Sequence, residues 1–141
     1  MGALIDNRVN AIATNSVKTM ADILYPLHVA LQVSNLEKAD DFYTHIIGLQ
    51  KVARNLTFAG SWYQIGSFQL HLIVSEWAKH PAREDKWGRH PHITFAIHDL
   101  EGVIRSLTEQ HIPFQMSSSG RAALFVKDPD GNVVELLKVS E

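Results

Sequence analysis

The chain has no cysteine, and this absence removes several kinds of chemistry at once. No disulfide framework can form, no thiol can act as a nucleophile, and no thiolate cage can hold a structural zinc ion. A strong excess of one charge is also lacking, because 13 lysines and arginines stand against 15 aspartates and glutamates, for a formal net charge of −2. This balance gives no electrostatic reason to expect nucleic acid or an acidic membrane surface as a partner.

Long hydrophobic runs are missing as well. No stretch approaches the roughly 20 apolar residues that a membrane-spanning helix needs. The first residues lack the basic start and apolar stretch of a signal peptide, and Asp6 stands where a myristoylation signal has Ser or Thr. We therefore expect a cytoplasmic protein whose partner is a small molecule.

What the chain does have is eight histidines, 45% hydrophobic residues and a repeated strand pattern. Residues 27–33 alternate apolar and polar side chains, and so do residues 91–97. Because successive side chains of a β-strand point to opposite faces, the apolar set of each run would line a buried face. His28 and His92 each stand at the head of their strand, on the other face. The two runs predict two copies of one small unit.

The same order of elements follows each of these strands. Asn35 and Asp99 are suited to cap the start of a helix, and three further strands are predicted after each helix. We predict an α+β protein of two βαβββ modules. Its parts would be an N-terminal extension, a first module, a charged linker and a second module, at residues 1–24, 25–75, 76–90 and 91–141. Trp77 and Trp87 in the linker are expected to anchor it against the core.

The last strand of each module carries further candidates for metal binding. His71 and Glu135 occupy matching positions, each directly before a leucine. If the first and last strands of each module are neighbours, His28, His71, His92 and Glu135 converge on one point. Imidazole and carboxylate donors suit a divalent Zn, Ni, Fe, Mn or Co ion. A ligand set of this kind that leaves coordination positions open is what a substrate-binding metal requires.

These features together resemble the vicinal oxygen chelate superfamily, which includes glyoxalases, bleomycin-resistance proteins, fosfomycin-resistance enzymes and extradiol dioxygenases. The carrying motifs are His28 with Asn35-Leu36 and Phe42-Tyr43, His92 with Asp99-Leu100, and the segment Asp128 to Leu136, within a resemblance that spans about Leu24 to Val139. The resemblance implies two modules whose sheets form a cup around a metal, with His28, His92 and Glu135 as ligands. At the remaining position relatives have Glu, Gln or His. Here it is His71, with Gln69 as the neighbour that can substitute.

Five side chains are candidates for contact with the substrate. They are Arg121, Phe125, Gln32, Thr94 and Trp62. By strand parity Arg121 and Phe125 share a face, and Arg121 would clamp an anionic group of the substrate. Without a bound metal, Glu135 would instead serve as a general base.

The reaction stays open between several classes. A metal-dependent lyase or isomerase of the glyoxalase type and a ring-cleaving dioxygenase are both compatible with these residues. The alternatives are a non-catalytic ligand-binding protein of the bleomycin-resistance kind and a fosfomycin-type thiol transferase. A homodimer is also possible, since relatives often pair.

Overall fold

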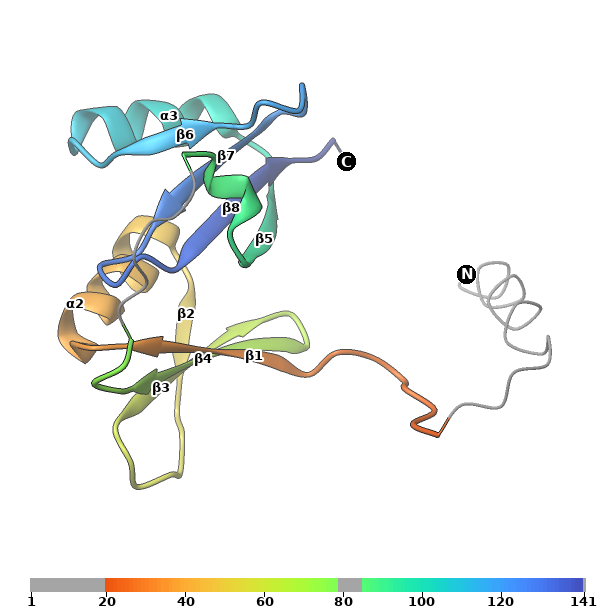
Figure 1. Cartoon of the computed structure of the whole chain (residues 1–141), viewed down its shortest axis with the longest axis vertical. Helices are drawn as coiled ribbons and strands as arrows, with labels where there is room; N and C mark the ends of the chain where they lie inside the picture. Colours follow the sequence, from red (N-terminus) through yellow and green to blue (C-terminus); the bar gives the residue numbers. More distant parts are fainter. Residues whose placement is uncertain (1–19, 79–84, 141) are drawn as a thin grey trace.

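The structure is a computed structural model that describes residues 20–78 and 85–140. The first module contains β1 (His28–Val33), α2 (Leu36–Asp41), η1 (Phe42–Ile47), β2 (Gln50–Val52), β3 (Gly60–Ile65) and β4 (Phe68–Val74). The second contains η2 (Trp87–Arg89), β5 (His92–Ile97), α3 (Leu100–Glu109), β6 (Phe114–Met116), β7 (Ala123–Lys127) and β8 (Val133–Lys138). Figure 1 shows the two sheets one above the other, with α2 between them and α3 at the far end. The predicted α+β fold of two βαβββ modules is confirmed.

Each module forms one four-stranded sheet of the same topology. The strand orders are β1-β4-β3-β2 and β5-β8-β7-β6, so the first and last strands of each module are parallel neighbours. Ala30 pairs with His71 in the first sheet, and Thr94 pairs with Glu135 in the second. This pairing places the candidate ligands of each module on adjacent strands, as the repeat predicted.

The helices begin where the capping residues predict. The Asn35 side chain accepts the backbone N–H of Lys38 at 3.0 Å, and Asp99 accepts that of Gly102 at 2.9 Å. Each cap satisfies a backbone donor that has no partner within the helix. After Asp41 the chain continues as a π-helical segment, and it ends at Gly48, whose φ of +88° favours glycine.

Both modules pack their apolar faces into one core. Leu70 and Leu72 of β4 and Val134 and Leu136 of β8 belong to the same cluster of buried side chains, together with Phe42 from η1. The apolar residues of β1 and β5 pack against this cluster. Because strand side chains alternate, the polar faces of both sheets are turned away from the shared core.

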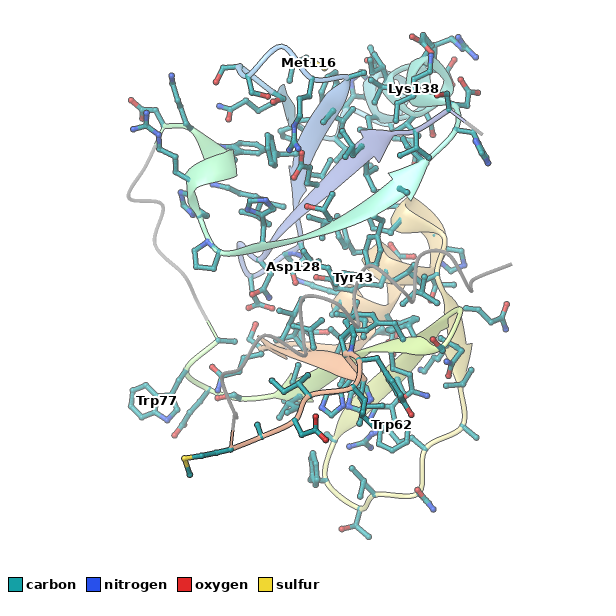
Figure 2. All side chains as sticks on the ribbon, turned by 90° about the vertical axis from the view of Figure 1, so that its right-hand side faces the viewer. Tyr43, Trp62, Trp77, Met116, Asp128 and Lys138 are labelled. Atoms are coloured by element: carbon teal, nitrogen blue, oxygen red, sulfur yellow. The ribbon has the colours of Figure 1, made fainter. Side chains whose placement is uncertain are left out.

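The Asp128–Asn132 turn joins the two modules. The Tyr43 hydroxyl donates to Asp128 at 2.9 Å, and the Ser34 backbone N–H donates to Asp130 at 2.9 Å. The Asn132 amide donates to the Gln32 carbonyl at 2.9 Å. Figure 2 shows Tyr43 and Asp128 between the modules, with Trp62 at the first sheet. The turn motif therefore fixes how the two modules pack.

The region expected to be a linker contains two tryptophans, which differ in burial. Trp87 is half-buried in the 3₁₀ segment η2, with the Lys127 ammonium 4.5 Å from its ring centroid. Trp77 is 79% exposed, so the expectation that it anchors the linker is wrong. No helix among the described residues is long and apolar enough to cross a membrane.

Candidate metal centre

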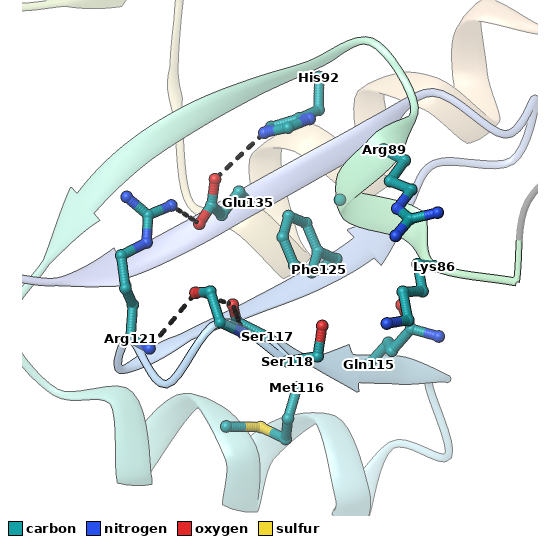
Figure 3. Close-up of a pocket in the computed structure, with 12 residues that line it drawn as sticks. Lys86, Arg89, His92, Gln115, Met116, Ser117, Ser118, Arg121, Phe125 and Glu135 are labelled. Carbon is teal, nitrogen blue, oxygen red and sulfur yellow. Dashed lines mark hydrogen bonds and ion pairs between the residues drawn. The ribbon is translucent and has the colours of Figure 1, made fainter.

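Glu135 is the centre of a polar cluster on the second sheet. Glu135 is only 1% exposed, and its carboxylate contacts three side chains. Figure 3 shows two of them, His92 and Arg121. Oε1 accepts the Thr94 hydroxyl at 2.7 Å and lies 3.1 Å from Nε2 of His92. Oε2 accepts a guanidinium N–H of Arg121 at 2.9 Å. A buried carboxylate with charged and polar partners is held in one orientation.

The hydrogen bond of the other His92 nitrogen determines what Nε2 can do. Nδ1 lies 2.7 Å from the carbonyl oxygen of His90, which can only accept, so Nδ1 carries a proton. In a neutral ring Nε2 then bears a lone pair, which points at the carboxylate oxygen of Glu135. Two acceptors at 3.1 Å repel unless positive charge lies between them. Either a proton on Nε2 or a metal cation supplies that charge.

The first sheet carries the other two histidines in a stack of rings. His71 lies between His28 and Trp62, with ring centroids 4.0 Å and 4.5 Å away and interplanar angles of 12° in both cases. The His71 Nε2 also hydrogen-bonds the Gln69 side chain at 2.8 Å. Burial, followed by the charges of His28 and Arg54, lowers the pKa of His71, so its ring is neutral at pH 7. A neutral imidazole is the form that binds metal.

The four predicted ligands thus form two pairs on two different sheets. We refer to His92 with Glu135 as the acidic half-site, and to His28 with His71 as the histidine half-site. Among the described residues, no group of three His, Asp or Glu side chains is placed to hold one metal ion. The expected convergence of all four within one chain is therefore wrong, because both apolar faces pack on the same core and turn the half-sites away from it.

The chemistry of the donors nevertheless fits a divalent transition metal. Two ligand atoms that lie about 2.0–2.2 Å from one tetrahedral zinc ion are about 3.3–3.6 Å apart. The distance of 3.1 Å between Nε2 and Oε1 is slightly shorter than that separation, so a small side-chain movement would admit the ion. The Nδ1 bond of His92 to a carbonyl is also the outer contact by which metal-binding histidines are usually oriented. Two further ligands from outside the acidic half-site would complete a four-coordinate centre.

A pocket of about 430 Å³ opens in front of the acidic half-site. Phe125 lies in its floor and meets the His92 ring edge-on, at a centroid distance of 5.5 Å. Arg121 lines the same pocket, but its guanidinium bonds Glu135, so it holds the carboxylate in place. The pocket is otherwise lined by Lys86, Gly88, Arg89, Gln115, Met116 and the serines 117–119.

The remaining candidates are divided between the modules. Thr94 contacts Glu135, whereas Trp62 lies in the ring stack of the first sheet. Gln32 lines a separate cavity of about 500 Å³ between β1 and β5, which His92 also borders. Sequence reasoning missed the pocket wall formed by η2. The one available signal was Trp87, since a tryptophan in a charged segment indicates packing.

Two curated proteins are similar to this chain over more than three quarters of its length. "Probable lactoylglutathione lyase" of Vibrio cholerae is 26% identical over 127 residues, covering 79% of this chain and 88% of the relative. "Glutathione transferase FosA" of Serratia marcescens is 27% identical over 110 residues, covering 77% of each chain.

Solved structures show the same fold. The crystal structure of a glyoxalase/dioxygenase from Nostoc punctiforme has a TM-score of 0.70 at 21% identity, covering 91% of this chain and 99% of that one. The family model "Glyoxalase/Bleomycin resistance protein/Dioxygenase superfamily" matches residues 26–136, which cover most of both modules and all four candidate ligands. The chain belongs to this superfamily.

Proposed function

We propose that the protein is a divalent-metal enzyme of the glyoxalase-like lyase or isomerase type, acting on a small molecule with two neighbouring oxygens. The observation that carries this proposal is the facing pair of acceptors in the acidic half-site, where Nε2 of His92 and Oε1 of Glu135 lie 3.1 Å apart. Positive charge must lie between these two atoms, and the buried carboxylate is already oriented to accept a cation there. The names of the curated relatives support the reaction class.

The complete site requires two copies of the chain. Each copy supplies an acidic half-site and a histidine half-site, and both are turned away from its own core. In a symmetric dimer, the acidic half-site of one copy meets the histidine half-site of the other, which gives two equivalent sites. His28 and His71 of the second copy then add two imidazoles to His92 and Glu135. The physical advantage is that one sequence builds a four-ligand centre without distorting its core.

The residues around Glu135 have separate tasks. A bound metal would supply Lewis acidity, which stabilises negative charge on two substrate oxygens. Arg121 and Thr94 hold the Glu135 carboxylate on both oxygens. The His90 carbonyl orients His92. Phe125 packs edge-on against the His92 ring and covers that side of it. Gln32 and Trp62 would face the substrate from the histidine half-site.

Thiol transfer is the second candidate. It is favoured by the relative named glutathione transferase, because His28, His92 and Glu135 form the two-histidine, one-glutamate set that the resemblance assigns to thiol transferases of the fosfomycin type. Both curated names contain glutathione, which supports a glutathione-bearing substrate or co-substrate for either candidate. Ring-cleaving oxygen chemistry would require iron in the same ligands.

Metal content measured after mixing two variants tests the proposal. His28→Ala removes the histidine half-site, and Glu135→Ala removes the acidic one, so each variant alone should hold no metal at a complete site. The two are unfolded together, refolded and assayed for bound metal by mass spectrometry. Random pairing makes about half of the dimers mixed, and each mixed dimer regains one of its two sites. The mixture should therefore recover about a quarter of the wild-type metal.

Two results would contradict the proposal. Metal retained equally by the wild type, His92→Ala and Glu135→Ala would remove these residues from the site. A mixture that holds only the average of its two components would show that a second copy completes nothing. The identity of the metal separates the chemistries, since zinc or nickel favours the lyase type and iron favours oxygen chemistry.

A further inference from the structure

A chain of hydrogen bonds runs along the polar face of the first sheet to His71. It consists of the half-buried side chains of Gln64, Gln69 and His71, which we call the relay. Nε2 of Gln69 lies 2.6 Å from Oε1 of Gln64, and Oε1 of Gln69 lies 2.8 Å from Nε2 of His71. Gln64 and Gln69 are directly opposed on β3 and β4, and His71 follows two residues later on the same face. Strand register therefore builds the relay.

The turn between β3 and β4 fixes the direction of the relay. Nε2 of Gln64 lies 2.8 Å from the Gly66 carbonyl oxygen and 3.5 Å from that of Phe68. Because a carbonyl oxygen can only accept, the amino group of Gln64 faces these two atoms and its oxygen faces Gln69. Gln69 then donates to that oxygen and turns its own oxygen toward His71. Nε2 of His71 must therefore carry a proton and donate it to Gln69.

This proton determines which nitrogen of His71 is left to bind a ligand. In the neutral ring the lone pair lies on Nδ1. The parallel rings of His28 and Trp62 cover both faces of the imidazole and restrict its rotation. His92 has the opposite arrangement, because its Nδ1 donates to a carbonyl and its lone pair lies on Nε2. The two half-sites thus offer different nitrogens.

We propose that Gln64 and Gln69 are positioning residues that keep a proton on Nε2 of His71, so that His71 offers Nδ1 to a metal ion. Gln69, which the sequence presents as a substitute ligand, then orients His71 and does not replace it. Hydrogen bonds of this kind fix the tautomer and the ring orientation of metal-binding histidines. As a statement about metal binding this inference rests on the proposed function, whereas the position of the proton does not.

The ¹⁵N NMR spectrum of the metal-free full chain locates the proton. The resonance of each ring nitrogen depends on whether it carries hydrogen, and a ring that exchanges between both tautomers gives intermediate values. At about pH 8 the rings are neutral, since the ordinary histidine pKa is about 6.5. The His71 signals are those that His71→Ala lacks, and the exposed His98 is the internal reference. We expect a protonated Nε2 and an unprotonated Nδ1 in His71, with resonances further apart than those of His98.

Substitutions at Gln64 test the relay without touching His71. Gln64→Met removes the acceptor that orients Gln69, so the separation of the two His71 resonances should shrink toward that of His98. Gln64→Glu is the rescue variant, because its carboxylate still accepts the Gln69 N–H and should keep the wild-type pattern. Gln50→Met is the matched control. It removes an exposed amide from the position opposite Gln64 on β2 and should leave His71 unchanged.

The outcomes separate this inference from the proposed function. An intermediate pattern for His71 in the wild type, a proton on its Nδ1, or a pattern that Gln64→Met leaves unchanged would each overturn the relay. Equal changes in Gln64→Met and Gln50→Met would overturn it as well. In protein loaded with ¹¹³Cd, coupling of the metal to Nδ1 of His71 supports the assignment, and coupling to Nε2 contradicts it. Absence of metal from the wild type would defeat the proposed function and leave the position of the proton established by the metal-free spectra.

Discussion

Replacing Tyr43 with phenylalanine should destabilise the protein measurably, because the lost hydroxyl joins the two modules. Tyr43 is 0% exposed and Asp128 is 4% exposed, so their 2.9 Å hydrogen bond is shielded from water. A buried hydrogen bond to a charged group contributes about 1.5–3 kcal/mol. Asp128 keeps three other donors, from the Asp130 N–H and the Asn132 backbone and side chain. We therefore expect the free energy of unfolding to fall by about 2 kcal/mol, which lies in the lower half of that range.

Urea unfolding at one fixed protein concentration measures this loss. With a slope of about 1–3 kcal/mol per molar urea, the midpoint should fall by roughly 1 M. Tyr25→Phe is the matched control, because it removes the same atom from a residue that is 64% exposed. It should change the stability by less than about 0.5 kcal/mol. Equal shifts in the two variants would refute the assignment of a stabilising contact to Tyr43.

The same substitution should alter the response to alkali. Burial, followed by the charge of Asp128, raises the pKa of Tyr43 well above its ordinary value. The folded state therefore keeps the Tyr43 proton at pH values where the unfolded state releases it. The contribution of Tyr43 to the free energy of unfolding is therefore complete below about pH 10, and it falls as the pH rises further. The difference between the wild type and Tyr43→Phe should accordingly shrink above pH 10.

Two further substitutions test local features. Gly88→Ala should lower the free energy of unfolding by about 1–3 kcal/mol, because the added Cβ would come 2.7 Å from Cζ of Phe125. An unchanged urea midpoint would contradict the packing of residues 87–89 on that ring. Asp99→Ala removes the helix cap that accepts the Gly102 N–H. Urea unfolding should show that the free energy of unfolding falls by about 1 kcal/mol. Asp99→Asn is the matched control and should retain most of the stability, because asparagine is also a good cap.

Most of the fold was predictable because its signals are local. Strand alternation around His28 and His92 identified the two duplicated strands, and side-chain caps at Asn35 and Asp99 marked both helix starts. The pairing of His92 with Glu135 also followed from sequence, since the repeat implied that the first and last strands are neighbours. Each of these structural features lies within one module.

The position of residues 85–90 was not predictable in the same way. Residues 85–90 have no periodicity, and their position depends on one amide from Gln115, far along the chain. The hydrogen-bond partner of Arg121 could not be predicted from the sequence either. Strand parity placed Arg121 on the face that it occupies, but whether its guanidinium meets a substrate or Glu135 depends on the loop that precedes β7.

The sequence by itself determined which face of each strand is polar and which residues on it can bind a metal. Only the tertiary structure decided where those faces point. Alternation fixes a side chain relative to its own sheet, whereas the direction of the sheet depends on how the two modules bury their apolar surfaces together. Here both modules share one core, joined by Tyr43 and Asp128, and this packing separates the histidine half-site from the acidic half-site of the same chain.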